Sequence, residues 1–108
     1  MVGINSKLSI ICGLTVEEID LSVTDARLTF GNGINLAIYN NFTVIGIVPS
    51  DAKKLIGKAV MNVDEKESTV TITFEDGMHI QIDLKNEAYN GPEAMQLRVP
   101  GMPIVIWN

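Results

Sequence analysis

Hydrophobic and polar residues alternate most regularly in the second half of the chain. Single threonines separate Val70, Ile72 and Phe74, and the apolar positions of 78–82 are likewise separated by polar residues. A period of two with β-branched residues on both faces is the pattern of β-strands. We therefore predict two strands that share one apolar face.

The residues between these strands set their register. A two-residue turn would place His79 opposite Phe74 and put polar side chains on the apolar face. A three-residue loop, 75–77, keeps that face apolar. Such a loop is typical of a type I turn closed by a left-handed residue, a conformation that Gly77 adopts without a Cβ clash. The predicted pairs are Phe74 with Met78, Ile72 with Ile80 and Val70 with Ile82.

The same pattern occurs twice in the chain. Residues 13–40 (the first copy) align without a gap with residues 57–84 (the second copy), 44 positions later. Identical residues are Gly13/Gly57, Val16/Val60, Asp20/Asp64, Thr29/Thr73, Phe30/Phe74, Gly33/Gly77 and Ile38/Ile82. The first copy therefore predicts a matching hairpin with the pairs Phe30–Ile34, Leu28–Leu36 and Ala26–Ile38.

Each copy begins with a segment in which two residues separate the apolar positions, Val16 from Ile19 and Val60 from Val63. A β-bulge in this leading strand would bring both apolar side chains inward. Each copy is then a three-stranded meander, and two copies can bury their apolar faces against each other. We predict a single domain, residues 1–108, that is mainly β: a duplicated meander forming a β-sandwich or small barrel-like fold, with one or two short helical turns.

Segments outside the repeat extend this unit. We expect residues 4–11 to form a first strand rather than a signal sequence, because the apolar run is short and no small-x-small cleavage site follows it. Residues 42–48 are predicted to form a further strand. Residues 104–107 are either a buried strand or an edge strand that awaits a partner.

Two segments favour helical turns. Residues 49–57 predict one or two turns, with Ser50 as the N-cap and Gly57 as the stop. Residues 90–95 predict a turn that opens a further helical turn, with Pro92 at its first position.

Composition places the chain among ordinary globular proteins of one domain, with 108 residues, 46% hydrophobic and 19% charged. The single cysteine, Cys12, excludes an intrachain disulfide and suits a reducing compartment. No apolar run approaches the roughly 20 residues that span a bilayer. We expect a cytoplasmic protein.

The net charge of −5 weighs against binding to nucleic acids or anionic membranes, both of which require a basic surface. The charge is uneven, since residues 57–108 carry eight acids and four bases whereas residues 1–44 carry four and two. Positively charged partners are therefore favoured. The alternative is that the acidic residues only keep the protein soluble.

Residues suited to catalysis or metal binding are few. His79 is the only histidine, which is too few for a β-barrel metal site, and we expect it on a strand surface. Cys12 aligns with Ile56 and is expected to be a small buried hydrophobe. Asp20 and Asp64 recur in both copies, but aspartates at strand ends commonly accept hydrogen bonds from nearby backbone N–H groups. We therefore expect no enzyme, no cofactor and no metal.

Surface recognition remains as the favoured role. Acidic side chains of the second half surround its turns, together with a tyrosine of the kind enriched at interfaces. The candidate partner-binding residues are Asp64, Glu65, Glu67, Glu75, Asp76, Asp83, Glu87, Tyr89 and Glu93. The alternative is an ordinary solvated acidic surface.

Three segments of the second half carry a family resemblance: LIGKAVMNVD, TVTITFEDGMHIQID and AYNGPEAMQL. The stretch over residues 55–97 resembles immunity proteins of contact-dependent growth inhibition and related bacterial toxin systems, and its most specific part is residues 89–94. The resemblance implies an intracellular, non-catalytic toxin inhibitor (an antitoxin) that binds one toxin domain, often a nuclease. The acidic charge agrees with this, because nucleases have basic grooves that an acidic inhibitor can occupy.

A second hypothesis comes from a different class of protein. The chain would be a structural or oligomerising β domain whose apolar segment 104–107 pairs with another subunit.

Overall fold

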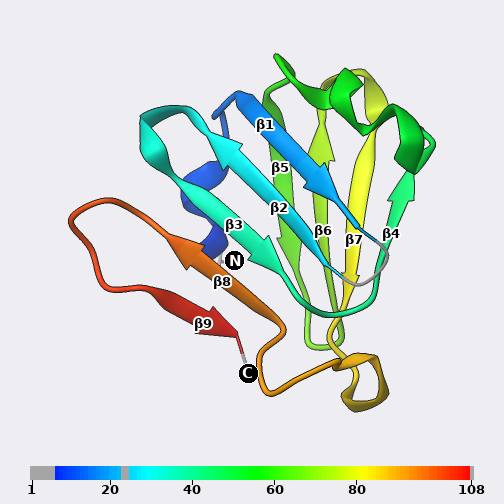
Figure 1. Cartoon of the computed structure of the whole chain (residues 1–108), viewed down its shortest axis with the longest axis vertical. Helices are drawn as coiled ribbons and strands as arrows, with labels where there is room; N and C mark the ends of the chain where they lie inside the picture. The colour runs from blue at the N-terminus through cyan, green and yellow to red at the C-terminus, as the bar shows by residue number, and fades with distance from the viewer. Residues whose placement is uncertain (1–6, 23–24, 108) are drawn as a thin grey trace.

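The computed structural model describes residues 7–22 and 25–107, and within them nine strands form two antiparallel sheets that face each other (Figure 1). One sheet has the order β1-β2-β3-β8-β9 and the other the order β4-β7-β6-β5. The strands are β1 Val16–Leu21, β2 Ala26–Phe30, β3 Asn35–Ile38, β4 Phe42–Ile45, β5 Val60–Glu65, β6 Thr69–Phe74, β7 His79–Asp83, β8 Met95–Arg98 and β9 Val105–Trp107. Short 3₁₀ turns are η1 Lys7–Ile11, η2 Gly31–Gly33, η3 Pro49–Leu55, η4 Glu75–Gly77 and η5 Asn86–Ala88.

The mainly β fold class is confirmed, and the two sheets form a sandwich. An isolated antiparallel bridge between Thr15 and Ala59 links them at one corner. These two residues are 44 positions apart, so the bridge joins equivalent points of the two copies. The hydrogen bonds around it are paired in the same way: Gly13 N donates to Val60 O, and Gly57 N donates to Val16 O, both at 2.8 Å. The two copies are therefore related by an approximate two-fold axis through this bridge.

The register predicted for both hairpins is confirmed. Ala26 pairs with Ile38 in the first copy, and Val70 pairs with Ile82 in the second. The predicted bulges are also present, one between Val16 and Glu18 and the other between Val60 and Asn62. The strand that follows each copy then crosses to the other sheet. β4 follows the first copy and pairs with β7, and β8 follows the second copy and pairs with β3. Each sheet is thus extended by a strand that follows the other copy in the chain.

The conformation of the hairpin loops differs in part from the prediction. Gly33 and Gly77 are left-handed as expected, with φ of 75° and 76°. The central residues Asn32 and Asp76 are left-handed as well, with φ of 70° and 67°, so the type I turn is wrong. Asn and Asp adopt this conformation more readily than other residues with a Cβ, because their short side chains form local hydrogen bonds.

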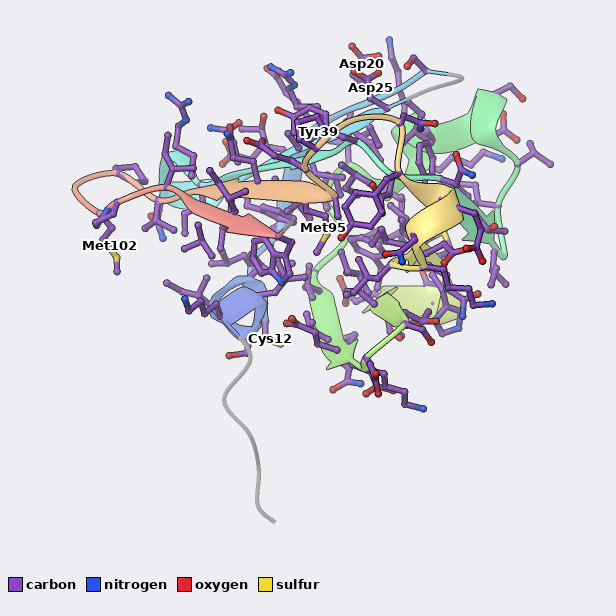
Figure 2. All side chains as sticks on the ribbon, turned by 90° about the horizontal axis from the view of Figure 1, so that it is seen from below. Cys12, Asp20, Asp25, Tyr39, Met95 and Met102 are labelled. Atoms are coloured by element: carbon purple, nitrogen blue, oxygen red, sulfur yellow. The ribbon has the colours of Figure 1, made fainter. Side chains whose placement is uncertain are left out.

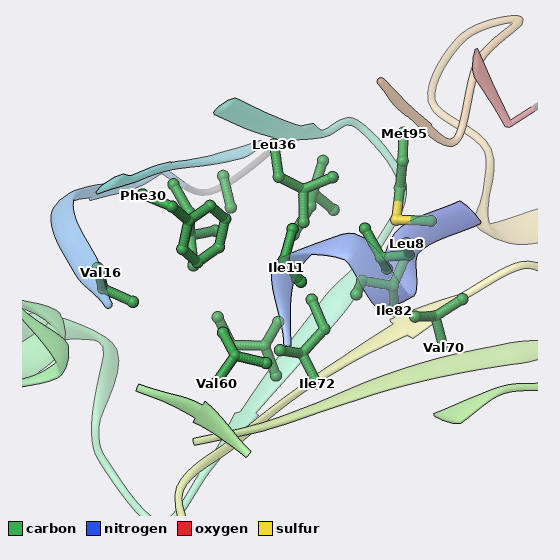
Figure 3. Close-up of a cluster of buried hydrophobic side chains, with 14 of the residues drawn as sticks. Leu8, Ile11, Val16, Phe30, Leu36, Val60, Val70, Ile72, Ile82 and Met95 are labelled. Atoms are coloured by element: carbon green, nitrogen blue, oxygen red, sulfur yellow. The ribbon is translucent and has the colours of Figure 1, made fainter. Parts of the chain in front are cut away.

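The core lies between the two sheets, where fully buried side chains from both copies meet (Figure 3). Phe30 and Phe74 are the largest of them, at 0% and 1% exposure. Leu8 and Ile11 extend from η1 into the same layer. Burial of apolar surface in this layer is the main stabilising contribution, at roughly 25 cal/mol per Å².

The strand predicted over residues 4–11 is wrong. Lys7–Ile11 forms the 3₁₀ turn η1, and residues 4–6 lie outside the described residues. The spacing of Leu8 and Ile11 suits three residues per turn and buries both side chains. By the offset of 44 residues, η1 corresponds to residues 51–55, which are all of η3 except its first two residues and were predicted to be helical.

The turns were predicted less well than the hairpins. Pro49 begins η3 and Val48 precedes it without a side-chain cap, so the N-cap assigned to Ser50 is wrong. Gly57 does follow the turn with a φ of 89°. No helical turn begins at Pro92, since the helical turn η5 comes earlier and Met95 already belongs to β8.

The two predicted apolar segments form short strands. The strand predicted over residues 42–48 ends at Ile45, because Gly46 follows with a φ of 86°. Residues 105–107 form β9, which lies at the edge of the five-stranded sheet. Ala94 N donates to Trp107 O at 2.6 Å, so the end of β9 is tied to the chain just before β8. In the described part of the chain, no helix is long and apolar enough to span a bilayer.

Candidate functional site

Five of the predicted acidic residues gather at one end of the four-stranded sheet. Antiparallel pairing places the end of β5, the start of β6 and the end of β7 side by side. Lys66 N donates to Thr69 O at 2.8 Å and Leu84 N donates to Ser68 O at 2.9 Å, which connects the three segments. We call this region the acidic end, and its carboxylates are Asp64, Glu65, Glu67, Asp83 and Glu87.

Two carboxylates of the acidic end are held in place by hydrogen bonds. Trp107 Nε1 donates to Glu65 Oε2 at 2.8 Å, which links the edge of the other sheet to β5. Lys85 N donates to Asp83 Oδ1 at 2.9 Å. Asp64 lies 3.6 Å from the ammonium group of Lys66 in an exposed ion pair. The five carboxylates are accompanied by only two lysines, Lys66 and Lys85, so this end remains negatively charged.

Glu75 and Asp76 lie at the opposite end of the same sheet, in η4. Glu75 Oε1 accepts a hydrogen bond from Ala59 N at 2.7 Å, which fastens the hairpin beside the bridge between the sheets. Asp76 Oδ2 lies 2.5 Å from Lys58 Nζ. The hydrogen bond to Asp76 and the charge of its carboxylate raise the pKa of Lys58 above its usual value. The nine predicted residues therefore do not form one surface.

The remaining two candidates, Tyr89 and Glu93, belong to the loop before β8. Asn90 Nδ2 donates to Tyr39 O at 3.0 Å, and Tyr39 N donates to Ala94 O at 2.8 Å. These bonds hold the loop against the end of β3. Tyr89 is half-buried and packs against the core.

A pocket of about 600 Å³ lies between this loop and the first copy. It is lined by Asp25, Tyr39, Asn90, Gly91, Pro92 and Glu93. Asp25 and Tyr39 lie on the same side of the molecule, on the outer face of the five-stranded sheet (Figure 2). No sequence pattern pointed to Asp25 and Tyr39, because they are more than 50 residues from Asn90 and its neighbours and only the strand order brings them together.

A second hollow of about 320 Å³ continues along that face. It is lined by Arg27, Asn35, Ala37, Tyr39, Gln96 and Arg98. Ala37 lies between Arg27 and Gln96 in one cross-strand row, and its small side chain leaves the depression between two long ones. This hollow was not predicted from the sequence, because Arg27 and Arg98 are far apart in the chain and no local pattern joins them.

The residues considered singly for catalysis or metal binding lie at exposed or half-buried positions of the surface. Cys12 is exposed, so the prediction of a buried thiol is wrong; its equivalent, Ile56, is itself 44% exposed. His79 is half-buried on β7, and its Nδ1 lies 2.9 Å from Thr73 Oγ1. Asp20 and Asp64 lie on different sheets. Among the described residues, no three His, Cys, Asp or Glu side chains are placed to hold a metal ion.

The chain matches no protein-family model, and no curated protein and no solved structure is similar to it. The two copies still allow a comparison within the molecule. Where equivalent positions of the two copies hold the same residue type, that residue serves the fold that both copies share. Where the two residues differ, the fold does not require either of them, and one can serve a function specific to its copy.

Proposed function

We propose that this protein is a cytoplasmic immunity protein that binds and neutralises a basic toxin domain, with a nuclease as the favoured kind. The observation that carries the proposal is the acidic end, where the strand order β5-β6-β7 assembles five carboxylates from three segments of the chain. The sequence resemblance over residues 55–97 covers the same strands.

The acidic end has the properties that rapid capture of a cation-rich partner requires. Glu67 and Glu87 are exposed, so they attract distant positive charge without a prior cost of desolvation. Glu65 and Asp83 are fixed by Trp107 and by the backbone of Lys85, which reduces the entropy lost on binding. Complementary charge raises association rates to as much as roughly 10⁸–10⁹ M⁻¹s⁻¹ at low salt.

Charge reversal at the acidic end tests the proposal. The proposal predicts a secreted protein in the neighbouring reading frame, and the probe is the C-terminal domain of that protein. Its association with this chain is measured by stopped flow at several salt concentrations. We expect Glu67→Lys/Glu87→Lys to lower the association rate roughly tenfold or more, and to flatten its dependence on salt.

The matched control is Glu17→Lys/Asp51→Lys, which makes the same change of charge away from the acidic end and should leave the rate close to that of the wild type. Protection of cells that express the toxin domain should follow the association rates. Absence of binding by the wild type, or a rate that does not respond to salt, would contradict the proposal.

A second candidate function, an oligomerising β domain, is favoured by the edge strand β9. Ile104 and Ile106 are 42% and 43% exposed there, and an apolar edge strand offers unpaired backbone groups to a second chain. If β9 pairs with another subunit, wild-type protein sediments as an oligomer and Ile106→Lys sediments as a monomer. Ile45→Lys, on the edge strand β4 and equally exposed at 43%, serves as the control. A monomeric wild type at all concentrations excludes this function.

A further inference from the structure

The two hollows on the outer face of the five-stranded sheet adjoin at Tyr39, which lines both. We call the two together the arginine groove. Its outward positions form three cross-strand rows: Asp25 beside Tyr39, then Arg27, Ala37 and Gln96, then Asn35 and Arg98. The first and last rows are four residues apart, which corresponds to about 14 Å at the usual rise of a strand.

Both arginines of the chain lie in this groove, although the protein is acidic overall. Their side chains are exposed, and the ion pairs found within the described residues involve lysines only. Asp20 is in register with Arg27 on β1, but the two do not form an ion pair there. The two guanidinium groups are therefore available to a ligand.

The second copy shows that the fold does not need these arginines. The position of Arg27 is held by Thr71, and the position of Arg98 beside β3 is held by Ile45 beside β7. By the same correspondence, Gln81 takes the place of Ala37, and it still lines a hollow of about 270 Å³ together with Thr69 and Asp83. The two equivalent faces of one architecture thus both carry a hollow but differ in the arginines that line it, which indicates a role specific to the first copy.

The chemistry of the groove differs between its two ends. At one end, Arg27 and Arg98 supply planar donor groups that match the oxygens of phosphate or carboxylate. Asn35 is oriented there by two hydrogen bonds: its Oδ1 accepts from Thr29 Oγ1 at 2.9 Å, and its Nδ2 donates to Gly33 O at 3.1 Å.

The other end contains two carboxylates and an aromatic ring. The carboxylates of Asp25 and Glu93 can accept hydrogen bonds from ring N–H or O–H groups, and they repel a second anionic group. Asp25 Oδ1 already accepts one hydrogen bond, from Ser22 Oγ. Tyr39 lies at this end, beside Asp25, and offers an aromatic face for stacking. A strand of nucleic acid, with a phosphate at every nucleotide, is disfavoured by these carboxylates.

We infer that the arginine groove binds a small molecule of mononucleotide size that has a phosphate or carboxylate at one end and an aromatic ring at the other. The oxyanion lies between Arg27 and Arg98, and the ring lies on Tyr39 with its polar edge toward Asp25 and Glu93. The combined hollows are within the range of roughly 300–1,000 Å³ usual for ligand sites. This site is on the opposite sheet from the acidic end and is independent of the toxin-binding proposal.

Binding of defined compounds by the intact chain tests the inference. The probes are the four nucleoside 5′-monophosphates, the corresponding nucleosides, and hydroxybenzoates as aromatic carboxylates, followed by two-dimensional NMR titration. We expect saturable shifts confined to β2, β3, β8 and the loop before β8. Nucleosides, which have no oxyanion, should bind at least tenfold more weakly than the monophosphates or the hydroxybenzoates, whichever of these two binds more tightly. Tighter binding of the monophosphates would identify the oxyanion as phosphate, and tighter binding of the hydroxybenzoates would identify it as carboxylate.

Variants copied from the second copy make the test specific. Arg27→Thr and Arg98→Ile should each weaken binding roughly tenfold or more, because each removes charge-assisted hydrogen bonds. Ala37→Gln keeps both arginines and introduces the residue that lines the hollow of the second copy, so it should weaken binding less than either arginine variant does. Lys54→Thr, which removes one positive charge from η3, should bind as the wild type does. All four should keep the melting temperature within a few degrees.

Two outcomes overturn the inference. One is the absence of saturable binding of every probe by the wild type. The other is an equal loss of affinity in Lys54→Thr and Arg27→Thr, which would indicate a general charge effect instead of a site.

Discussion

Replacement of Phe74 by alanine is expected to lower the free energy of unfolding by roughly 3–5 kcal/mol, the usual cost of removing a buried aromatic ring. Phe74 is 1% exposed, and its ring lies in the layer where the two copies meet. The lost stabilisation combines the transfer of the ring from water with the cavity left behind. Because total stability is commonly only about 5–15 kcal/mol, this variant is expected to be close to unfolding. Denaturation in urea measures the change.

The two-fold relation supplies the control for this prediction. Phe30 is 0% exposed at the equivalent position, so Phe30→Ala should cost about as much as Phe74→Ala. Phe42→Ala should cost clearly less, because that ring is only half-buried on the edge strand β4. If one of the two equivalent variants were nearly neutral, the two copies would not contribute equally to one shared core.

Replacement of Asn40 by aspartate is expected to destabilise the protein by about 3–5 kcal/mol at neutral pH, the range found for an uncompensated buried charge. Asn40 is fully buried where the chain crosses from β3 to β4. Its Nδ2 donates to Asp83 O at 2.8 Å, and its Oδ1 has no hydrogen-bond partner in the described part of the chain. An aspartate would lose the donor and add a negative charge beside a carbonyl oxygen.

The effect of this substitution should depend on pH. Burial favours the protonated carboxyl group, so its pKa is higher in the folded than in the unfolded protein. The unfolded state then binds fewer protons, and the stability of Asn40→Asp relative to the wild type falls as the pH rises above the usual carboxyl pKa of about 4. At lower pH, much of the difference should disappear. Denaturant titrations of both proteins at several pH values measure this.

Asn40→Leu separates the charge from the lost hydrogen bond. Leu84 occupies the equivalent position in the second copy, so a leucine suits this kind of crossover. The variant loses the bond to Asp83 O but also removes the unpaired oxygen, and we expect a smaller, pH-independent loss of stability. Equal losses in the aspartate and leucine variants would show that the hydrogen bond, not the buried charge, dominates. The position matters to both proposed surfaces, because Asn40 follows Tyr39 of the arginine groove and holds Asp83 of the acidic end.

Sequence patterns predicted the parts of the fold that local interactions control. The alternation in β6 and β7 and the three-residue loops predicted the register, because a slip of one residue would turn the apolar faces outward. The error at Cys12 shows the limit of the repeat. Its alignment with Ile56 was appropriate, but an apolar residue type does not establish burial, and both positions are exposed.

Candidate sites were predicted less well, since they depend on which strand ends meet. The acidic residues were predicted as a group because they surround the turns of the second half, yet Glu75 and Asp76 lie at the far end of the sheet from Glu67. Arg27 and Arg98 are 71 residues apart and have no pattern that joins them. They share a face because β8 crosses over to pair with β3.

Patterns along the amino-acid sequence were sufficient to predict two copies of a β meander, their hairpin registers and their bulges, and composition alone shows the excess of negative charge. The meanders, registers and bulges depend on residues close together in the chain, whose apolar period and turn preferences leave few alternatives. The exchange of β4 and β8 between the sheets, the insertion of η1 into the core and the two surfaces that result became apparent from the folded arrangement. These features depend on how two apolar faces cover each other, and that packing is a property of distant segments that no local pattern encodes.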